Sequence, residues 1–208
     1  MEKTTYFNER LTAIMLIVTL SLWVLPLSAK GDGALETLRM KFEEGNRILD
    51  DTELATAERR AEKEEKLWQL SRQIFDYELI SQMVLASRWD EFTPVQQDEF
   101  KAAFTGFLRR TYVPRLMERY NGERVYFVRQ NLISPSRADV EAYIMWRNRK
   151  ITFNLYMVKR QGDWKICDIS ALGISTIKNY RAQFRWLLLS DSPAQLIARL
   201  NARANPAS

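Results

Sequence analysis

Histidine is missing from all 208 residues of the chain, and cysteine occurs once, as Cys167. Without an imidazole there is no Ser-His-Asp or Cys-His nucleophile, no histidine general base and no histidine-containing zinc or haem site. A single cysteine also excludes an internal disulfide and a metal cluster held by several cysteines. We therefore expect no catalytic residues, no bound metal and no cofactor.

Sequence motifs for other chemistry are also scarce. The chain has no glycine-rich phosphate loop, no serine elbow and no paired-carboxylate spacing. Asp76 and Asp168 lie next to apolar residues, where a carboxyl pKa can rise, but these positions are also typical of a helix cap and a strand end. An enzyme using either carboxylate for acid-base chemistry on an apolar substrate remains an alternative at this stage.

The N-terminal segment resembles an export signal. Residues 11–27 are apolar apart from two threonines, a serine and a proline, and they follow a short segment that carries Lys3 and Arg10. This pattern predicts a signal peptide over residues 1–29, with an uncleaved membrane anchor as the alternative. We expect an exported protein, and nucleic acid is an unexpected partner despite the net charge of +5.

The composition of the remainder, with 46% apolar and 27% charged residues in the whole chain, is ordinary for one folded domain over residues 30–208. Apolar spacing predicts helices from residue 33 to about residue 75, including a charged, solvated helix over residues 53–66 with a Glu62–Lys66 pair. Asp76 is placed to cap a further helix. We assign residues 30–121 to a helical part, 122–170 to a sheet and 171–208 to C-terminal helices.

Two capping boxes mark helix starts. Thr93 and Gln96, with proline at the first helical position, open a phenylalanine-rich helix in which Pro114 should introduce a kink or an end. Ser192 and Gln195 repeat the box before a terminal helix. Between the two boxes, apolar residues alternate with a period of two and predict about four strands joined by short turns. The fold class is therefore α+β, with a curved, mainly antiparallel sheet packed against N-terminal and C-terminal helices.

Aromatic and aliphatic stripes run along these helices and strands. Stripes of this kind usually form a packed core, but helices and a curved sheet can also enclose an apolar cavity for a lipid-like ligand. Periodicity alone leaves both interpretations open.

Several short motifs together resemble the MlaC family of periplasmic phospholipid-binding proteins. In the first half they are Phe75-Asp76-Tyr77, Leu85-Ala86-Ser87-Arg88-Trp89, Thr93-Pro94, Gln96-Gln97, Phe100, Phe104, Leu108 and Thr111-Tyr112. In the second half they are Gly162-Asp163-Trp164-Lys165-Ile166-Cys167-Asp168, Gly173-Ile174-Ser175 and Asn179-Tyr180-Arg181-Ala182-Gln183-Phe184. The motifs span about residues 75–200.

The resemblance implies a monomeric periplasmic carrier with its ligand in an apolar lipid cavity. Such a carrier shuttles phospholipid between the outer membrane and an inner-membrane ABC transporter and maintains the lipid asymmetry of the outer membrane. Its expected partners are the transporter's lipid-binding subunit and an outer-membrane lipoprotein-porin complex.

We expect the residues that line the lipid cavity to come from one helix, the sheet and the C-terminal helices. They are Phe100, Phe104, Leu108, Tyr112, Phe127, Ile144, Phe153, Leu155, Ile166, Ile177, Tyr180, Arg181 and Phe184. Arg181 is a candidate for the lipid headgroup or the cavity mouth. Its alternative role is an ion pair with Asp76 or Asp168.

Two departures from the family pattern affect the ligand. Ala86 stands where members of the family often have glycine, and Ser170-Ala171-Leu172 replaces a more acidic segment. A hopanoid or another apolar ligand is therefore an alternative to phospholipid. A purely structural envelope protein without a cavity is a further alternative.

Overall fold

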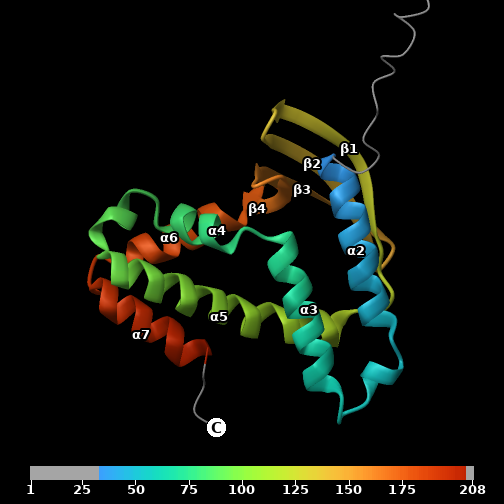
Figure 1. Cartoon of the computed structure of the whole chain (residues 1–208), viewed down its shortest axis with the longest axis horizontal. Coiled ribbons are helices and arrows are strands. Elements are labelled where there is room, and N and C mark those ends of the chain that lie inside the picture. Colours follow the sequence, from blue (N-terminus) through green and yellow to red (C-terminus); the bar gives the residue numbers. More distant parts are fainter. Residues whose placement is uncertain (1–32, 205–208) are drawn as a thin grey trace, which may run out of the picture. The chain divides into compact units, whose positions relative to one another are not determined.

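The computed structural model describes residues 33–204, so the predicted signal peptide lies outside the described residues. The helices are α2 (Ala34–Asp50), α3 (Arg60–Ile74), α4 (Tyr77–Leu85), α5 (Pro94–Arg119), α6 (Thr176–Leu187) and α7 (Pro193–Ala204), with short 3-10 turns at Glu53–Ala55 and Ala86–Glu91. The strands are β1 (Val125–Ser134), β2 (Arg137–Trp146), β3 (Arg149–Arg160), β4 (Asp163–Ala171) and β5 (Ile174–Ser175). Figure 1 shows this arrangement.

The five strands form one antiparallel meander in the order β1-β2-β3-β4-β5. The predicted α+β class and curved antiparallel sheet are confirmed, and β5 is one short strand more than the pattern indicated. Arg147 and Asn148 close the β2–β3 hairpin with φ values of 48° and 59°. A two-residue turn with both φ values positive matches the right-handed twist of the strands that it joins.

Helix starts are where the capping residues predict them. The Asp76 carboxylate accepts a hydrogen bond from the Leu79 N–H at 2.9 Å and caps α4. Thr93 and Gln96 form both bonds of the capping box at α5. Ser192 and Gln195 do the same at α7. These bonds satisfy N–H groups that a helix terminus otherwise leaves unpaired.

One helical prediction is wrong, and one of the two alternatives for Pro114 is excluded. The charged stretch over residues 53–66 is not one helix, because Asp51 accepts hydrogen bonds from the next N–H groups and turns the chain before α3 begins at Arg60. Within α3, the Glu62–Lys66 ion pair forms at 2.9 Å. Pro114 does not end its helix, since α5 continues to Arg119. Burial of the neighbouring Val113 against α3 helps to offset the backbone hydrogen bond that proline removes.

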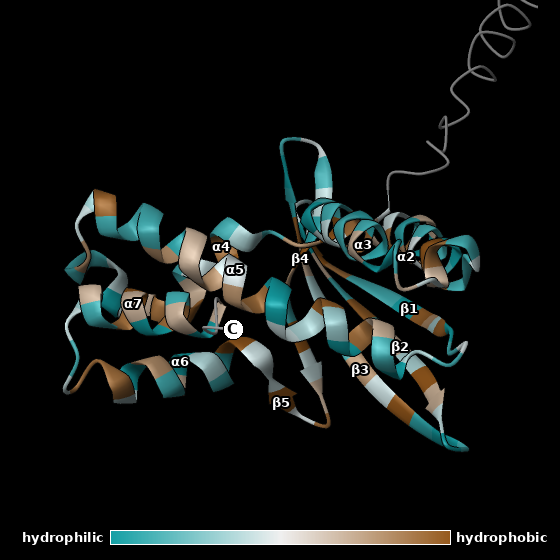
Figure 2. Cartoon of the chain, turned by 90° about the horizontal axis from the view of Figure 1, so that it is seen from below, coloured by the Kyte–Doolittle hydropathy of each residue, from teal (hydrophilic) through white to brown (hydrophobic). Residues whose placement is uncertain are grey.

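The buried residues form two main cores. The helical core lies among α4, α5, α6 and α7 and contains Phe100, Phe104, Tyr180 and Phe184. The covered core lies between α2 and the sheet. In Figure 2 the helices α4 to α7 lie on one side and the sheet with α2 and α3 on the other. Phe75 packs against both cores, and its backbone bridges to Ile166 of β4.

Candidate functional site

One half of a sheet face is completely covered by α2. Ala34 and Leu38 of this helix are 0% and 1% exposed and pack on β2, β3 and β4. The sheet residues beneath them, Val140, Leu155 and Ile166, are each 0% exposed. The apolar side chains of this half of the face are therefore buried within the protein.

The other half of the same face stays partly exposed. Strand register places Val125 opposite Ile144 and Ile144 opposite Ile151, while Phe153 lies two residues from Leu155 along β3. Residues two apart on a strand point to the same side, so these side chains continue the face that α2 covers farther along. We call the half-buried residues of this half the open strip: Val125, Phe127, Ile144, Ile151, Phe153 and Ile169.

Phe42 of α2 lies edge-on against Phe127 of the strip, with ring centroids 5.4 Å apart, and farther along, α2 contacts other helices. There Ile48 and Leu49 pack with α3 and α5 rather than with the strands. The Asp50 carboxylate then accepts hydrogen bonds from the Tyr120 hydroxyl at 2.7 Å and from Arg124 at 2.6 Å. The Tyr120 bond and the Arg124 charge hold the pKa of Asp50 below its usual range. The end of α2 is thus fixed to the end of α5 and the start of β1.

A second apolar surface lies on α5. Leu108, Tyr112 and Leu116 follow one another at intervals of four residues, so they share one side of the helix. Tyr112 and Leu116 are 48% and 47% exposed, which is high for apolar residues near the centre of a domain. The helix runs below the sheet in Figure 1 and crosses the strands in the perpendicular view of Figure 2. We call these three residues the α5 stripe.

The hydroxyls of Tyr112 and Tyr180 join the stripe to α6. Their oxygens are 2.8 Å apart and share a hydrogen bond. Burial, followed by this bond, raises the pKa of Tyr180. The contact satisfies the polar end of a tyrosine that is otherwise buried among phenylalanines.

The structure divides the expected lining residues into three groups. Phe100, Phe104, Ile177, Tyr180 and Phe184 lie in the helical core, and Leu155 and Ile166 lie in the covered core. Phe127, Ile144 and Phe153 belong to the open strip, while Leu108 and Tyr112 belong to the α5 stripe. The expectation omitted Val125, Ile151, Ile169 and Leu116, although strand alternation and helical spacing carried the signal for them. The apolar cavity itself stays a prediction.

Arg181 makes a contact that the sequence did not indicate. Its Nε and Nη2 donate to the Met83 carbonyl at 3.0 and 2.7 Å, so α6 is tied to the end of α4. Asp76 instead pairs with Arg160 at 3.2 Å. The ion pair proposed for Arg181 is therefore replaced by a bond to backbone.

Asp168 lines a groove of about 700 Å³ on the other face of the sheet. Its carboxylate accepts hydrogen bonds from the Ser175 hydroxyl at 2.5 Å and from the Ile177 N–H at 3.0 Å. Like Asp76, it accepts a hydrogen bond from a backbone N–H at the start of a helix. Cys167, beside it, is 6% exposed, and burial together with the Asp168 charge raises its pKa to about 11. A thiol with this pKa is a packing residue at neutral pH.

Over residues 33–204, no three of the His, Cys, Asp and Glu side chains are grouped so that they could hold a metal ion. The helices of the same region were also searched for membrane spans, and none has the length and hydrophobicity to cross a bilayer.

Comparisons with known proteins agree with this architecture. The family model described as MlaC protein matches residues 42–202. A solved structure with a similar fold is the phospholipid-binding protein from Ralstonia solanacearum in complex with a phospholipid, with a TM-score of 0.68 and 22% identity. The match covers 82% of this chain and 96% of that protein. No curated protein shows a significant sequence match.

Proposed function

Because this chain belongs to the MlaC family, we propose that it binds a phospholipid and carries it through an aqueous compartment. The observation that carries the proposal is the open strip, an apolar sheet surface that the fold leaves partly exposed beside a covered core. The phospholipid complex of the similar structure supports the choice of ligand. The acyl chains would lie between the open strip and the α5 stripe.

The free energy of transfer favours such a site. Each methylene removed from water contributes about 0.8 kcal/mol, so two acyl chains of about 15 carbons contribute on the order of 20 kcal/mol before the costs of binding. A carrier must cover most of this apolar surface and still release it at a membrane. That task needs apolar volume and no covalent chemistry, which agrees with a chain that lacks histidine.

We place the carrier in the periplasm, after export directed by residues 1–29. There it would exchange lipid with the lipid-binding subunit of an inner-membrane ABC transporter and with an outer-membrane lipoprotein-porin complex, and so maintain the lipid asymmetry of the outer membrane. The support for this location and these partners is membership of the family together with the apolar N-terminal segment.

Native mass spectrometry of the gently purified protein tests the proposal. We expect a bound mass in the phospholipid range, and extraction of the lipid identifies it against the hopanoid alternative. Recovery of the lipid unchanged after incubation separates a carrier from an enzyme. A spectrum of the protein alone would contradict the proposal.

Two exposed positions on α5 provide a matched pair of variants. Leu116→Asp places a charge on the α5 stripe, whereas Val95→Asp places the same charge at the start of the helix, where the side chain is 67% exposed. We expect Leu116→Asp to lose most of the bound lipid and Val95→Asp to keep it, because a carboxylate is poorly tolerated beside acyl chains. Equal lipid occupancy in the two variants would place the ligand elsewhere.

A further inference from the structure

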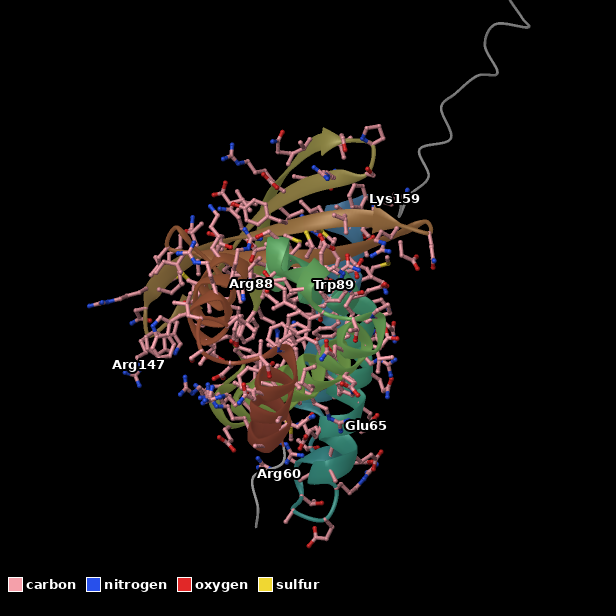
Figure 3. All side chains as sticks on the ribbon, turned by 90° about the vertical axis from the view of Figure 1, so that its left-hand side faces the viewer. Arg60, Glu65, Arg88, Trp89, Arg147 and Lys159 are labelled. Atoms are coloured by element: carbon pink, nitrogen blue, oxygen red, sulfur yellow. The ribbon has the colours of Figure 1, made fainter. Side chains whose placement is uncertain are left out.

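The turns at one end of the sheet lie on the same side of the molecule as α6. The β2–β3 hairpin closes between Trp146 and Arg149, and the β4–β5 turn closes between Ala171 and Ile174. In Figure 2 both turns and α6 lie along the lower edge of the molecule. Figure 3 shows Arg147 projecting outward at the edge of the molecule. We call this side the docking face. It consists of residues 145–150, residues 172–174, the exposed side of α6 and the residues that follow α6 as far as Leu189.

Large apolar side chains are exposed along the docking face. Trp146 and Met145 of the hairpin are each 46% exposed, and Leu172 of the β4–β5 turn is 79% exposed. Ile174, Trp186 and Leu189 are 67%, 71% and 76% exposed. Each of these groups would gain free energy by leaving water, and tryptophan favours the boundary between water and hydrocarbon.

Leu172 is also held in an unfavourable backbone conformation. Its φ of 52° is uncommon for a residue with a bulky side chain, and it is the first residue of a two-residue turn. An asparagine or glycine would satisfy the turn better. An exposed leucine at this point therefore lacks a folding explanation.

The segments that form the docking face contain no acidic residue. No aspartate or glutamate occurs between Glu141 and Asp163, or between Asp168 and Asp191. Arg147, Arg149 and Lys150 are exposed and form no ion pair with any carboxylate of residues 33–204. Arg147 and Lys150 lie over the rings of Trp146 and Tyr143 at 4.7 and 4.4 Å, so cations and aromatic groups share the hairpin tip.

We propose that the docking face binds the surface of an anionic phospholipid bilayer. Trp146 and Leu172 would enter the interface between headgroups and acyl chains, while the hairpin cations contact lipid phosphates. Trp146 lies two residues beyond Ile144 on β2 and so points to the same side of the sheet as the open strip. Docking therefore places one end of the strip at the membrane. The role of docking in lipid exchange rests on the proposed function, but vesicle binding itself is measured independently of bound lipid.

The test is flotation of the full protein with vesicles of phosphatidylethanolamine that contain one-third phosphatidylglycerol. We expect binding at low salt, weaker binding at high salt, and little binding to vesicles of phosphatidylcholine. The triple variant Arg147→Gln, Arg149→Gln, Lys150→Gln should bind the anionic vesicles about a hundred-fold more weakly. Trp146→Ala with Trp186→Ala should also reduce binding.

Each variant has a control of the same chemistry away from the docking face. Arg39→Gln, Arg47→Gln, Arg137→Gln removes three exposed cations from α2 and from the opposite end of the sheet. Leu132→Ala with Ile133→Ala removes two apolar side chains that are 56% and 57% exposed on β1. Both controls should bind vesicles as the wild type does. All variants are first compared with the wild type by thermal unfolding.

Three results would overturn the proposal. They are the absence of wild-type binding to anionic vesicles, equal loss of binding in the two triple variants, and stronger binding to a single-stranded oligonucleotide than to the vesicles. Native mass spectrometry of the triple variant Arg147→Gln, Arg149→Gln, Lys150→Gln separates this proposal from the carrier function. A variant that keeps its lipid but fails to float supports the docking face, whereas wild-type protein that floats without bound lipid leaves docking intact and contradicts the carrier.

Discussion

The helical core and the sheet contain similar aromatic stripes but use them differently. Phe104 of α5 is 0% exposed and has ring contacts with Phe100, Phe107, Tyr180 and Phe184. Phe153 of β3 has the same side chain in a regular alternation, yet it is only half buried. The core around the first residue is built from four helices, whereas the core beside the second is covered mainly by α2.

This difference shows where the fold reserves apolar surface. Burying a large apolar side chain stabilises a protein by about 1.5–3 kcal/mol, so an apolar strip left partly exposed forgoes stability that closer packing would supply. In the helical core that stabilisation is realised within the protein. On the open strip it is available to a ligand.

Truncation of one phenylalanine in each region should give the largest difference in stability. We expect Phe104→Ala to lower the free energy of unfolding by about 3–5 kcal/mol, because it leaves a cavity among packed rings. Phe153→Ala should cost about 1–2 kcal/mol in lipid-free protein, since its ring is partly in water already. Urea unfolding measures both values. Equal losses would mean that the strip is as well packed as the helical core.

Removal of bound lipid should affect the sheet more than the helical core. A ligand that binds only the folded state stabilises it by about 3 kcal/mol at a free concentration a hundred times its Kd. We therefore expect delipidation to lower the Tm of the wild type. In Phe153→Ala this shift should shrink, and an unchanged wild-type Tm would show that the apolar strip holds no ligand.

Loss of the Tyr112 hydroxyl tests the connection between the α5 stripe and α6. Tyr112→Phe leaves the buried Tyr180 hydroxyl without its partner and should cost about 1–2 kcal/mol by urea unfolding. Because the pKa of Tyr180 is raised in the fold, the wild type should also lose stability above about pH 10, where tyrosine ionises in the unfolded chain. An increase in stability above that pH would contradict this assignment.

The smallest change in the free energy of unfolding is expected from a substitution at Ala86, between α4 and α5. Ala86 has φ of 51° and ψ of −122°, a conformation that glycine adopts without a steric penalty. Ala86→Gly should raise the free energy of unfolding by about 1 kcal/mol, whereas glycine at the nearby helical Ser81 should lower it. Calorimetry of the two variants checks the signs, and a destabilised Ala86→Gly would refute the backbone argument.

Residues close together in the sequence were enough to predict several elements of the fold. The residues that cap α4, α5 and α7 were identifiable because each cap uses neighbours three residues apart. Ala86 was recognisable as a departure from the family pattern, but only the backbone angles explain it. The sequence did not show whether α5 would continue past Pro114, because the contacts of the neighbouring Val113 come from α3, far away in the sequence.

The sequence by itself determined the α+β class, the antiparallel meander, the starts of α4, α5 and α7 and the absence of histidine. These properties depend on composition and on spacings within a few residues. Only the tertiary structure decided that Phe104 lies in a filled core, that Phe153 lies on an open strip and that Arg181 binds a backbone carbonyl. Periodicity predicts the face of a helix or strand on which a side chain lies. The residues that pack against that side chain come from distant parts of the chain.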